Sequence, residues 1–200
     1  MCGQFAILGS IKAIKDYYNF LKEGSFILDE NDFYKFESSK LISLPNEKVK
    51  PMDYVPIVVG LKDNNIKHTI ISIIPARWGL VPFWSKDDKI AYKTINARIE
   101  TIHEKPSFKY AYAKRRCLIP FTGFFERVSL KDTEKPFGTL HYFQNENDNF
   151  LSFAGLYEIW GAERLITFTI ITCPANDEVS KVHHRMPLIL DKTEAMVYMG

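Results

Sequence analysis

Cys2 carries the most reactive combination of groups in this sequence, because removal of the initiator Met1 would make it an N-terminal cysteine. An N-terminal cysteine has a thiol of pKa near ~8.5 and an α-amine of pKa near ~8 on one short frame. The two groups can add in turn to an aldehyde, first as a Schiff base and then as a thiazolidine ring. Alternatively, the amine can act as the base for the thiol in acyl transfer. The small side chain at position 2 permits Met1 removal, and Gly3 gives a substrate a flexible approach.

A row of polar side chains alternates with small or apolar ones in Asn96-Ala97-Arg98-Ile99-Glu100. In an extended backbone, Asn96, Arg98 and Glu100 point to the same face. An amide, a guanidinium and a carboxylate in a row suit a phosphate or sugar site, since Arg can grip a phosphate through two nitrogens. A solvated strand face with an internal ion pair is the alternative.

Glu126 ends an apolar run, Cys117–Phe125, that crosses a Pro and a Gly. A carboxyl group that is partly withdrawn from water can shuttle protons near neutral pH. The alternative is a capping or surface glutamate. Cys117 itself is expected to be a small core residue.

His183-His184-Arg185 precedes an apolar strand at Leu188–Leu190. A neutral histidine moves protons at pH 7, and an arginine can hold an anion. Adjacent side chains point apart in an extended chain, so we expect at most one of the two histidines to face a common site. No Cys or His partner lies at ligand spacing, so we expect no metal and no cofactor.

Two tryptophans flank a Gly and a Pro in Trp78-Gly79-Leu80-Val81-Pro82-Phe83-Trp84. A rigid aromatic loop of this kind can stack on exposed nucleic-acid bases, at about 1–3 kcal/mol per base. The alternative is that the tryptophans fill the core.

The bulk composition is that of an ordinary globular chain. The 200 residues are 46% apolar and 25% charged, with a net charge of +2, which excludes strong overall basicity but not a local basic groove. Three widely spaced cysteines argue against a disulfide framework. The start of the chain lacks the apolar core of a signal peptide, so we expect a cytoplasmic protein without a membrane span.

Helix and strand signals predict more strands than helices. Ser10 is expected to cap a helix that Gly24 ends, and Asp191 to cap the last helix. The remaining expected elements are a strand at Cys2–Leu8, a short helix at Asp29–Phe36, strands at Ile57–Val59 and His68–Ile74, a helix at Pro106–Lys114, and strands at Leu140–Phe143, Phe150–Leu156 and Leu165–Thr172. A turn at 146–149 would join the first two of these last strands. Because no βαβ unit repeats, we expect one α+β domain over residues 1–200, with a mainly antiparallel, barrel-like sheet and flanking helices.

Taken together, these segments resemble the SOS response-associated peptidase (SRAP) family of abasic-site-processing proteins. The matching motifs occur in family order over nearly the whole chain: Met1-Cys2-Gly3, Trp78-Gly79-Leu80-Val81-Pro82, Asn96-Ala97-Arg98 with Glu100-Thr101, Lys105-Pro106-Ser107-Phe108, Arg116-Cys117-Leu118-Ile119-Pro120, Gly123-Phe124 with Glu126, Phe153-Ala154-Gly155-Leu156, Thr169-Ile170-Ile171-Thr172 and Arg185-Met186-Pro187.

The resemblance implies an enzyme that binds single-stranded DNA, including junctions with duplex, and crosslinks to abasic sites through a thiazolidine, with an associated autopeptidase activity. It implies that Cys2 is the covalent residue, that Asn96 positions the cysteine and the opened sugar, and that Glu126 and His183 transfer protons. The DNA-binding residues that it implies are Pro51, Trp78, Arg98 and Arg185. The protein is expected to be a monomer, nucleoid-associated when bound to DNA.

The sequence departs from the family pattern at a few positions. Gln4 stands where an Arg is usual, Arg127 replaces a Trp, and His184 replaces an acidic residue. Of an early Asn-x-x-Pro segment only Pro51 is carried over. These changes bear on DNA binding more than on the chemistry.

Two other functions fit an N-terminal cysteine. The first is an amidotransferase with an N-terminal nucleophile, although its Asn-Gly and Gly-Asp pairs do not occur in this chain. A glutaminase assay would discriminate it. The second is a non-catalytic single-strand-binding module in which Cys2 is incidental.

Overall fold

A computed structural model describes residues 2–23, 26–28, 40–62, 69–128, 138–145 and 150–200. The α+β fold with mainly antiparallel sheets is confirmed. Its strands are β1 (Gln4–Ile7), β2 (Phe26–Leu28), β3 (Asn46–Val49), β4 (Tyr54–Lys62), β5 (Thr69–Trp78), β6 (Asn96–Arg98), β7 (Arg116–Phe121), β8 (Gly123–Arg127), β9 (Leu140–Gln144), β10 (Leu151–Trp160), β11 (Leu165–Pro174), β12 (Arg185–Pro187) and β13 (Ile189–Leu190). Its helices within the described residues are α1 (Ile11–Tyr17), α2 (Lys109–Lys114), α3 (Asp177–Ser180), α4 (Lys192–Met199) and the 3-10 helices Tyr18–Glu23 and Lys89–Lys93.

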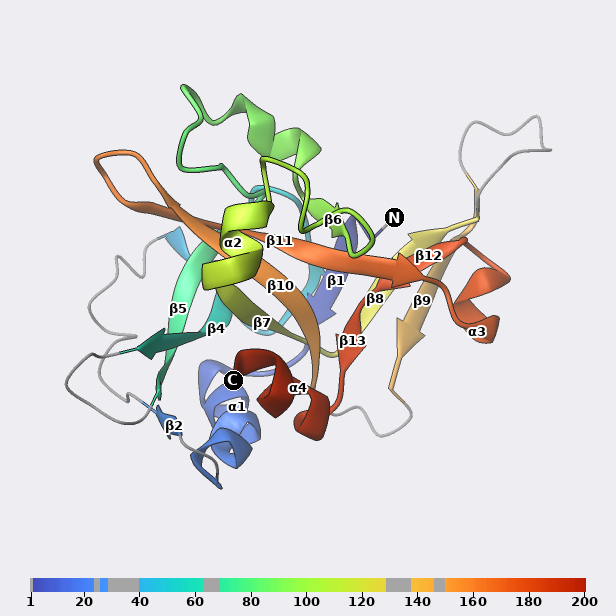
Figure 1. Cartoon of the computed structure of the whole chain (residues 1–200). Helices are drawn as coiled ribbons and strands as arrows, with labels where there is room; N and C mark the ends of the chain where they lie inside the picture. The colour runs from blue at the N-terminus through green and yellow to red at the C-terminus, as the bar shows by residue number, and fades with distance from the viewer. Residues whose placement is uncertain (1, 24–25, 29–39, 63–68, 129–137, 146–149) are drawn as a thin grey trace.

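Five strands of the larger sheet close into a ring. The order β11-β10-β7-β4-β5 is antiparallel throughout, and a parallel pairing of β5 with β11 joins the two ends. The short strand β6 adds to β11 in parallel, with Asn96 opposite Ile170 and Arg98 opposite Thr172. The strand β12 pairs with the carboxyl-terminal end of β11 (Figure 1).

The smaller sheet holds the start of the chain in its interior. Its order is β3-β1-β8-β9, so β1 has a hydrogen-bonded partner on both sides. Gln4 lies opposite Phe125 and Phe5 opposite Phe124. Because an interior strand is fixed at both edges, the residues just before β1 are held against the protein rather than loose.

Helix ends agree with the capping signals in the sequence. Ser10 accepts a hydrogen bond from the backbone of Ala13 and begins α1, as predicted, although a 3-10 helix from Tyr18 replaces the last α-helical turn. Asp191 and Glu194 form a reciprocal capping box at α4. The predicted helix at 106–114 begins later, at Lys109. No helix in the described ranges is both long and apolar enough to cross a membrane.

Most predicted strands lie where expected and are too short, whereas the predicted strand at Cys2–Leu8 is longer than the observed β1. β4, β5 and β10 each extend beyond the predicted ends, and β5 runs through Pro75 to Trp78. No strand was predicted between residues 45 and 56, but β3 and the start of β4 lie there. The expected helix at 29–36 and the turn at 146–149 lie outside the described residues.

The core fills the space between the ring and the small sheet with aromatic side chains. Trp78 is fully buried, with its ring centroid 5.1 Å from that of Phe5 and 6.3 Å from that of Phe168. Phe5 in turn packs edge-on against Phe153 at 5.6 Å. The strand that begins at Gln4 is therefore locked to the ring by its own side chains.

Candidate active site

Cys2 lies immediately before β1 and has no exposed surface. Its Sγ donates a long hydrogen bond of 3.6 Å to the carbonyl oxygen of Gln4. Burial, and secondly the nearby negative charge of Glu126, raise the pKa of the Cys2 thiol to about 12. The thiol is therefore protonated at neutral pH and needs a base before it can act as a nucleophile.

Asn96 holds the backbone of Cys2 in place. Its Nδ2 donates to the carbonyl oxygen of Cys2 at 2.8 Å, across 94 positions of sequence. The strand β6, which carries Asn96, is fixed by its parallel pairing with β11. The other amide atom, Oδ1, is buried and has no hydrogen-bond partner among the described residues. An acceptor of this kind is available to a donor that the described residues do not supply.

Glu126 brings a buried carboxylate to the same place from β8. Only 5% of the residue is exposed, and its Oε1 accepts a hydrogen bond of 3.3 Å from the backbone N–H of Arg127. Glu126 and Gly3 both line a hollow of about 190 Å³, which we call the Glu126 hollow; its other lining residues are Gln4, Phe125, Arg127 and Leu140. Cys2 is fully buried and does not line this hollow, whereas its neighbour Gly3 does.

Arg185 and Glu100 form a charged brace between β12 and the turn after β6. The two terminal nitrogens of Arg185 donate to the two carboxylate oxygens of Glu100 at 2.9 and 3.0 Å. Nη2 also donates to the carbonyl oxygen of Thr172 at 2.7 Å. These hydrogen bonds from Arg185 hold the pKa of the Glu100 carboxyl below its usual value. Arg185 is 8% exposed, so the phosphate contact expected of it would compete with this brace.

His183 is positioned by the backbone of Arg185. Its Nδ1 accepts a hydrogen bond of 3.0 Å from the Arg185 N–H and lies 3.1 Å from the Arg185 carbonyl oxygen. The expectation that the two adjacent histidines point apart was wrong, because their rings stack with centroids 4.4 Å apart. The reason is local: residues 183 and 184 lie in the bend before β12 rather than in extended strand.

Arg98 is exposed to solvent, whereas Pro51 is only half-exposed. Arg98 ends β6, two residues after Asn96, and its side chain is exposed. Pro51 is half-buried in the turn before β4, where the following Met52 N–H donates to the carbonyl oxygen of Trp78 at 2.9 Å. Arg98 is thus available to an anion, and Pro51 directly precedes the residue that is hydrogen-bonded to the end of β5.

The tryptophan that faces solvent is Trp84, not Trp78. The indole of Trp78 is fully buried and donates to the carbonyl oxygen of Ile95 at 2.8 Å, so neither face is open to a base. The strand β5 ends before Gly79, whose φ of +123° favours glycine and whose added Cβ would come within 2.8 Å of the Ala91 carbonyl oxygen; the chain then stays buried through Pro82. Trp84, beyond this turn, is 48% exposed.

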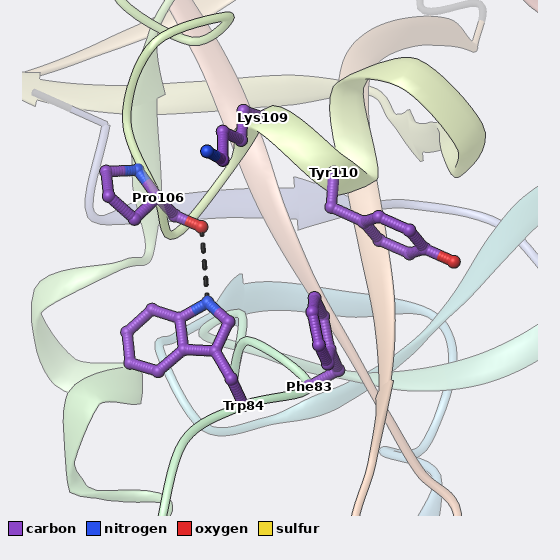
Figure 2. Close-up of a pocket in the computed structure, with 5 residues that line it drawn as sticks. All are labelled: Phe83, Trp84, Pro106, Lys109 and Tyr110. Carbon is purple, nitrogen blue, oxygen red and sulfur yellow. Dashed lines mark hydrogen bonds between the residues drawn. The ribbon is translucent and has the colours of Figure 1, made fainter.

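Exposed aromatic side chains from two segments form a cleft of about 500 Å³ (Figure 2). Phe83 and Trp84 face the segment that carries Pro106 and Tyr110, and the indole nitrogen of Trp84 donates to the Pro106 carbonyl oxygen at 3.3 Å. The rings of Phe83 and Tyr110 lie 5.1 Å apart. We call this the aromatic cleft; it is lined by Phe83, Trp84, Pro106, Lys109 and Tyr110.

The structure therefore brings together some of the residues predicted from the sequence and separates others. Cys2, Asn96 and Glu126 converge, and β6 links them to Arg98 and to the brace of Glu100 and Arg185. Trp78 lies in the core instead. The sequence signal for the aromatic cleft was the same tryptophan loop, but the pattern alone did not tell which ring is exposed.

Comparison with known proteins identifies the family of this chain. The sequence profile described as "SOS response associated peptidase (SRAP)" matches residues 1–200. The chain belongs to the SRAP family. This SRAP chain is 34% identical to the abasic site processing protein YoqW of Bacillus subtilis over 196 residues, which cover 95% of this chain and 76% of YoqW. It is 36% identical to the abasic site processing protein HMCES of Gallus gallus over 146 residues, 62% of this chain and 44% of that protein.

Solved structures share the SRAP fold. A protein from Bacteroides thetaiotaomicron superposes with a TM-score of 0.73 at 28% identity, covering 98% of this chain and 81% of that one. A phage-related protein from Bordetella bronchiseptica superposes with a TM-score of 0.67 at 24% identity, covering 99% of this chain and 81% of that one. The second likeness concerns the fold alone.

Proposed function

We propose that this protein processes abasic sites in single-stranded DNA by forming a covalent thiazolidine through Cys2 once Met1 is removed. The observation that carries the proposal is the hydrogen bond from Asn96 to the Cys2 carbonyl oxygen, made beside the buried Glu126. It supports a residue 2 held in one orientation next to a base. The SRAP relatives that bear the name abasic site processing protein supply the substrate.

The reaction begins with the α-amine of Cys2. The amine attacks C1′ of the ring-opened deoxyribose aldehyde and forms a C–N bond, and the resulting carbinolamine loses one water to give a Schiff base. The Cys2 sulfur then adds to the same carbon, forms a C–S bond and gives up its proton, which closes the five-membered ring. Because the second addition is intramolecular, proximity accounts for much of its rate.

Glu126 and His183 are the proton carriers in this proposal. The raised pKa of the thiol means that sulfur attack needs a base at the moment of bond formation, and the Glu126 carboxylate is the neighbour whose charge the thiol senses. His183 fits a proton donor to the departing water, since its Nδ1 has an Arg185 backbone donor and acceptor at 3.0 and 3.1 Å. Nδ1 of His183 therefore has a hydrogen-bond partner whether or not it carries a proton.

We propose that Arg98 and the aromatic cleft bind the DNA strand. The exposed Arg98 lies two residues from Asn96 and suits the phosphate of the reacting nucleotide. The aromatic cleft suits stacking of bases along the strand, with Trp84 in the role expected of Trp78. Lys109 adds a positive charge at the edge of this cleft.

The test uses protein whose removal of Met1 has been verified by intact mass, mixed with a single-stranded oligonucleotide that contains one abasic site. Wild type is expected to give a heat-stable adduct, and Cys2→Ala none. Cys2→Ser keeps the amine, so it should give an adduct only when borohydride reduces the Schiff base. Equal heat-stable adduct from wild type and Cys2→Ala would defeat the proposal, and so would the absence of any adduct from wild type.

An autopeptidase activity on the Met1–Cys2 bond is a second candidate, favoured by the family description. The Asn96 amide holds the carbonyl oxygen of Cys2, which is one peptide beyond the scissile carbonyl, so its role there would be to orient the nucleophile. Intact mass after expression with methionine aminopeptidase inhibited is the measurement. Met1 should be lost from wild type and retained in Cys2→Ala; retention in both would refute self-cleavage.

A further inference from the structure

The ring of His184 lies against the ring of His183 in the bend before β12. Their centroids are 4.4 Å apart and their planes differ by 25°. His184 is exposed and His183 is half-buried, so His184 shields one face of the His183 ring from solvent. Stacking of this kind restrains the orientation of both rings. The proton transfers proposed above use His183 and leave this second imidazole without a role.

The backbone of the two histidines is fixed on both sides. The N–H of His183 donates to the carbonyl oxygen of Val179 at 2.9 Å, at the end of α3. The carbonyl oxygen of His184 accepts a hydrogen bond of 3.1 Å from the N–H of Ala175, just after β11. Arg185, the next residue, begins β12. The stacked rings are therefore mounted on a bend whose backbone is held at each residue.

Two different contacts define the plane of the His183 ring. At the edge of the ring, Nδ1 accepts a hydrogen bond of 3.0 Å from the Arg185 N–H, which in the neutral ring places the proton on Nε2. A hydrogen bond to one ring nitrogen still allows the ring to tilt about that nitrogen. The face of the His184 ring opposes this tilt. The two contacts together fix the direction in which Nε2 of His183 points.

The direction of Nε2 matters because the backbone of Arg185 already engages Nδ1. Nε2 is thus the nitrogen that can donate a proton to the water leaving the carbinolamine. Proton transfer requires a heavy-atom separation of about 2.6–3.2 Å. A displacement of about 1 Å at a reacting group can lower the rate by ~100-fold. A ring held only at Nδ1 would spend part of its time outside the productive range.

We infer that His184 is a positioning residue for His183, because its ring stacks on that of His183 and keeps Nε2 aligned with the sugar that Cys2 attacks. This inference rests on the proposed function, which gives His183 its part in proton transfer. The role belongs to the aromatic face of His184 and does not need its ring nitrogens. Phenylalanine should therefore replace His184, whereas a small polar residue should not.

The first experiment tests the stack without any DNA. The ring-proton shifts of His183 are measured by NMR at one pH in full-length wild type, His184→Phe and His184→Ser. The ring current of an aromatic neighbour displaces these shifts, so they should stay displaced in His184→Phe and return toward those of an unstructured histidine peptide in His184→Ser. Identical His183 shifts in wild type and His184→Ser would show that the rings do not stack and would overturn the inference.

The second experiment measures the rate of crosslinking to a single-stranded oligonucleotide with one abasic site, using protein from which Met1 has been removed. His184→Ser should react about two- to tenfold more slowly than wild type, the loss that corresponds to one aromatic pair. His184→Phe should stay within about twofold of wild type. A wild-type rate in His184→Ser, or an equal loss in His184→Phe, would refute the assignment alone. Absence of adduct from wild type would refute the proposed function itself, and with it the role of His184.

A matched control and a double variant separate positioning from a general loss of stability. His103→Ser removes a histidine whose side chain is 57% exposed in the turns after β6, and it should leave the rate unchanged. His183→Gln should slow crosslinking, and adding His184→Ser to it should cause no further loss, because both changes act through one ring. A further loss of similar size in the double variant, or an equal loss in His103→Ser, would contradict the inference.

Discussion

Two groups of residues differ in how the fold holds them. The first is buried or half-buried and lies in or beside three strands: Cys2, Asn96 and Glu126. The second projects into solvent from a loop and a short helix: Phe83, Trp84 and Tyr110. The first group is fixed by backbone pairing on β1, β6 and β8. The second is fixed by contacts between side chains across an open cleft. This difference fits a division of labour in which the sheets hold the reacting groups and the exposed loops receive the polymer.

The largest expected effect is on the thiol of Cys2. With its pKa raised from an ordinary 9.0 to about 12, the thiolate fraction at pH 8 falls about 1000-fold. Alkylation of Cys2 by iodoacetamide, measured by peptide mass spectrometry, should be slower than that of a cysteine peptide by at least this factor. Below pH 9 both rates should rise tenfold per pH unit; above it the peptide should level off while Cys2 continues to rise. The half-buried Cys173 in the same protein serves as the internal reference.

Removal of the Glu126 carboxylate tests the group of Cys2, Asn96 and Glu126 further. Glu126→Gln preserves the shape of the side chain but cannot accept a proton, so the crosslinking rate should fall by about 10²–10⁴. Binding of an intact oligonucleotide should stay within about twofold, as the proposed DNA contacts lie elsewhere. The matched control is Glu104→Gln, at an exposed glutamate. If Glu126→Gln crosslinks at the wild-type rate, the carboxylate has no part in the chemistry.

The two tryptophans of one loop give the sharpest contrast between the regions. Trp84→Ala should weaken single-strand binding by about 1–3 kcal/mol and leave the free energy of unfolding nearly unchanged. Trp78→Ala should lower the free energy of unfolding by about 3–5 kcal/mol, because it empties a core position packed by Phe5 and Phe168. Urea denaturation and fluorescence anisotropy measure the two effects. A destabilising Trp84→Ala with unchanged DNA binding would reverse the assignment.

The smallest expected effect concerns the brace of Arg185 and Glu100. Glu100 is 45% exposed, so loss of the ion pair in Glu100→Gln should cost about 1 kcal/mol or less. The pKa of the Glu100 carboxyl is lowered in the folded protein, so this stabilisation is fully present above the ordinary value of 4.5 and is lost as pH falls through the lowered pKa. Melting temperatures of wild type and Glu100→Gln should therefore differ at pH 6 and converge in strong acid. A constant difference across that range would show that the charge of Glu100 is not responsible.

Local signals in the sequence predicted local structure well. Ser10 and Asp191 begin helices where their capping side chains predict it, because an N-cap bonds within its own first turn. The strands β7 and β8 were not predicted as strands, since Pro120 interrupts the pattern. In the structure Pro120 lies opposite Ser152 of β10, beyond the two positions where β7 pairs with β4, so its missing N–H is tolerated.

The arrangement of the site depended on long-range pairing that the sequence does not display. The contact of Asn96 with Cys2 was inferred from family resemblance alone, since the strand β6 has three residues and exists only by pairing with β11. Likewise, neither Trp78 nor Trp84 has a local feature that decides which one is buried. The difference in their exposure follows from β5 ending inside the ring and from the chain reaching the surface only after Pro82.

The interior position of β1 has one further consequence. A chain terminus is ordinarily the first part of a protein to fray, but here the residues that follow Cys2 are paired on both edges and packed through Phe5. Amide hydrogens of Phe5 and Ile7 should therefore exchange with solvent only when the whole protein opens. Under the proposed function, Cys2 is a nucleophile placed by folding rather than by the arrival of its substrate, so its reaction rate should rise and fall with the stability of the entire fold.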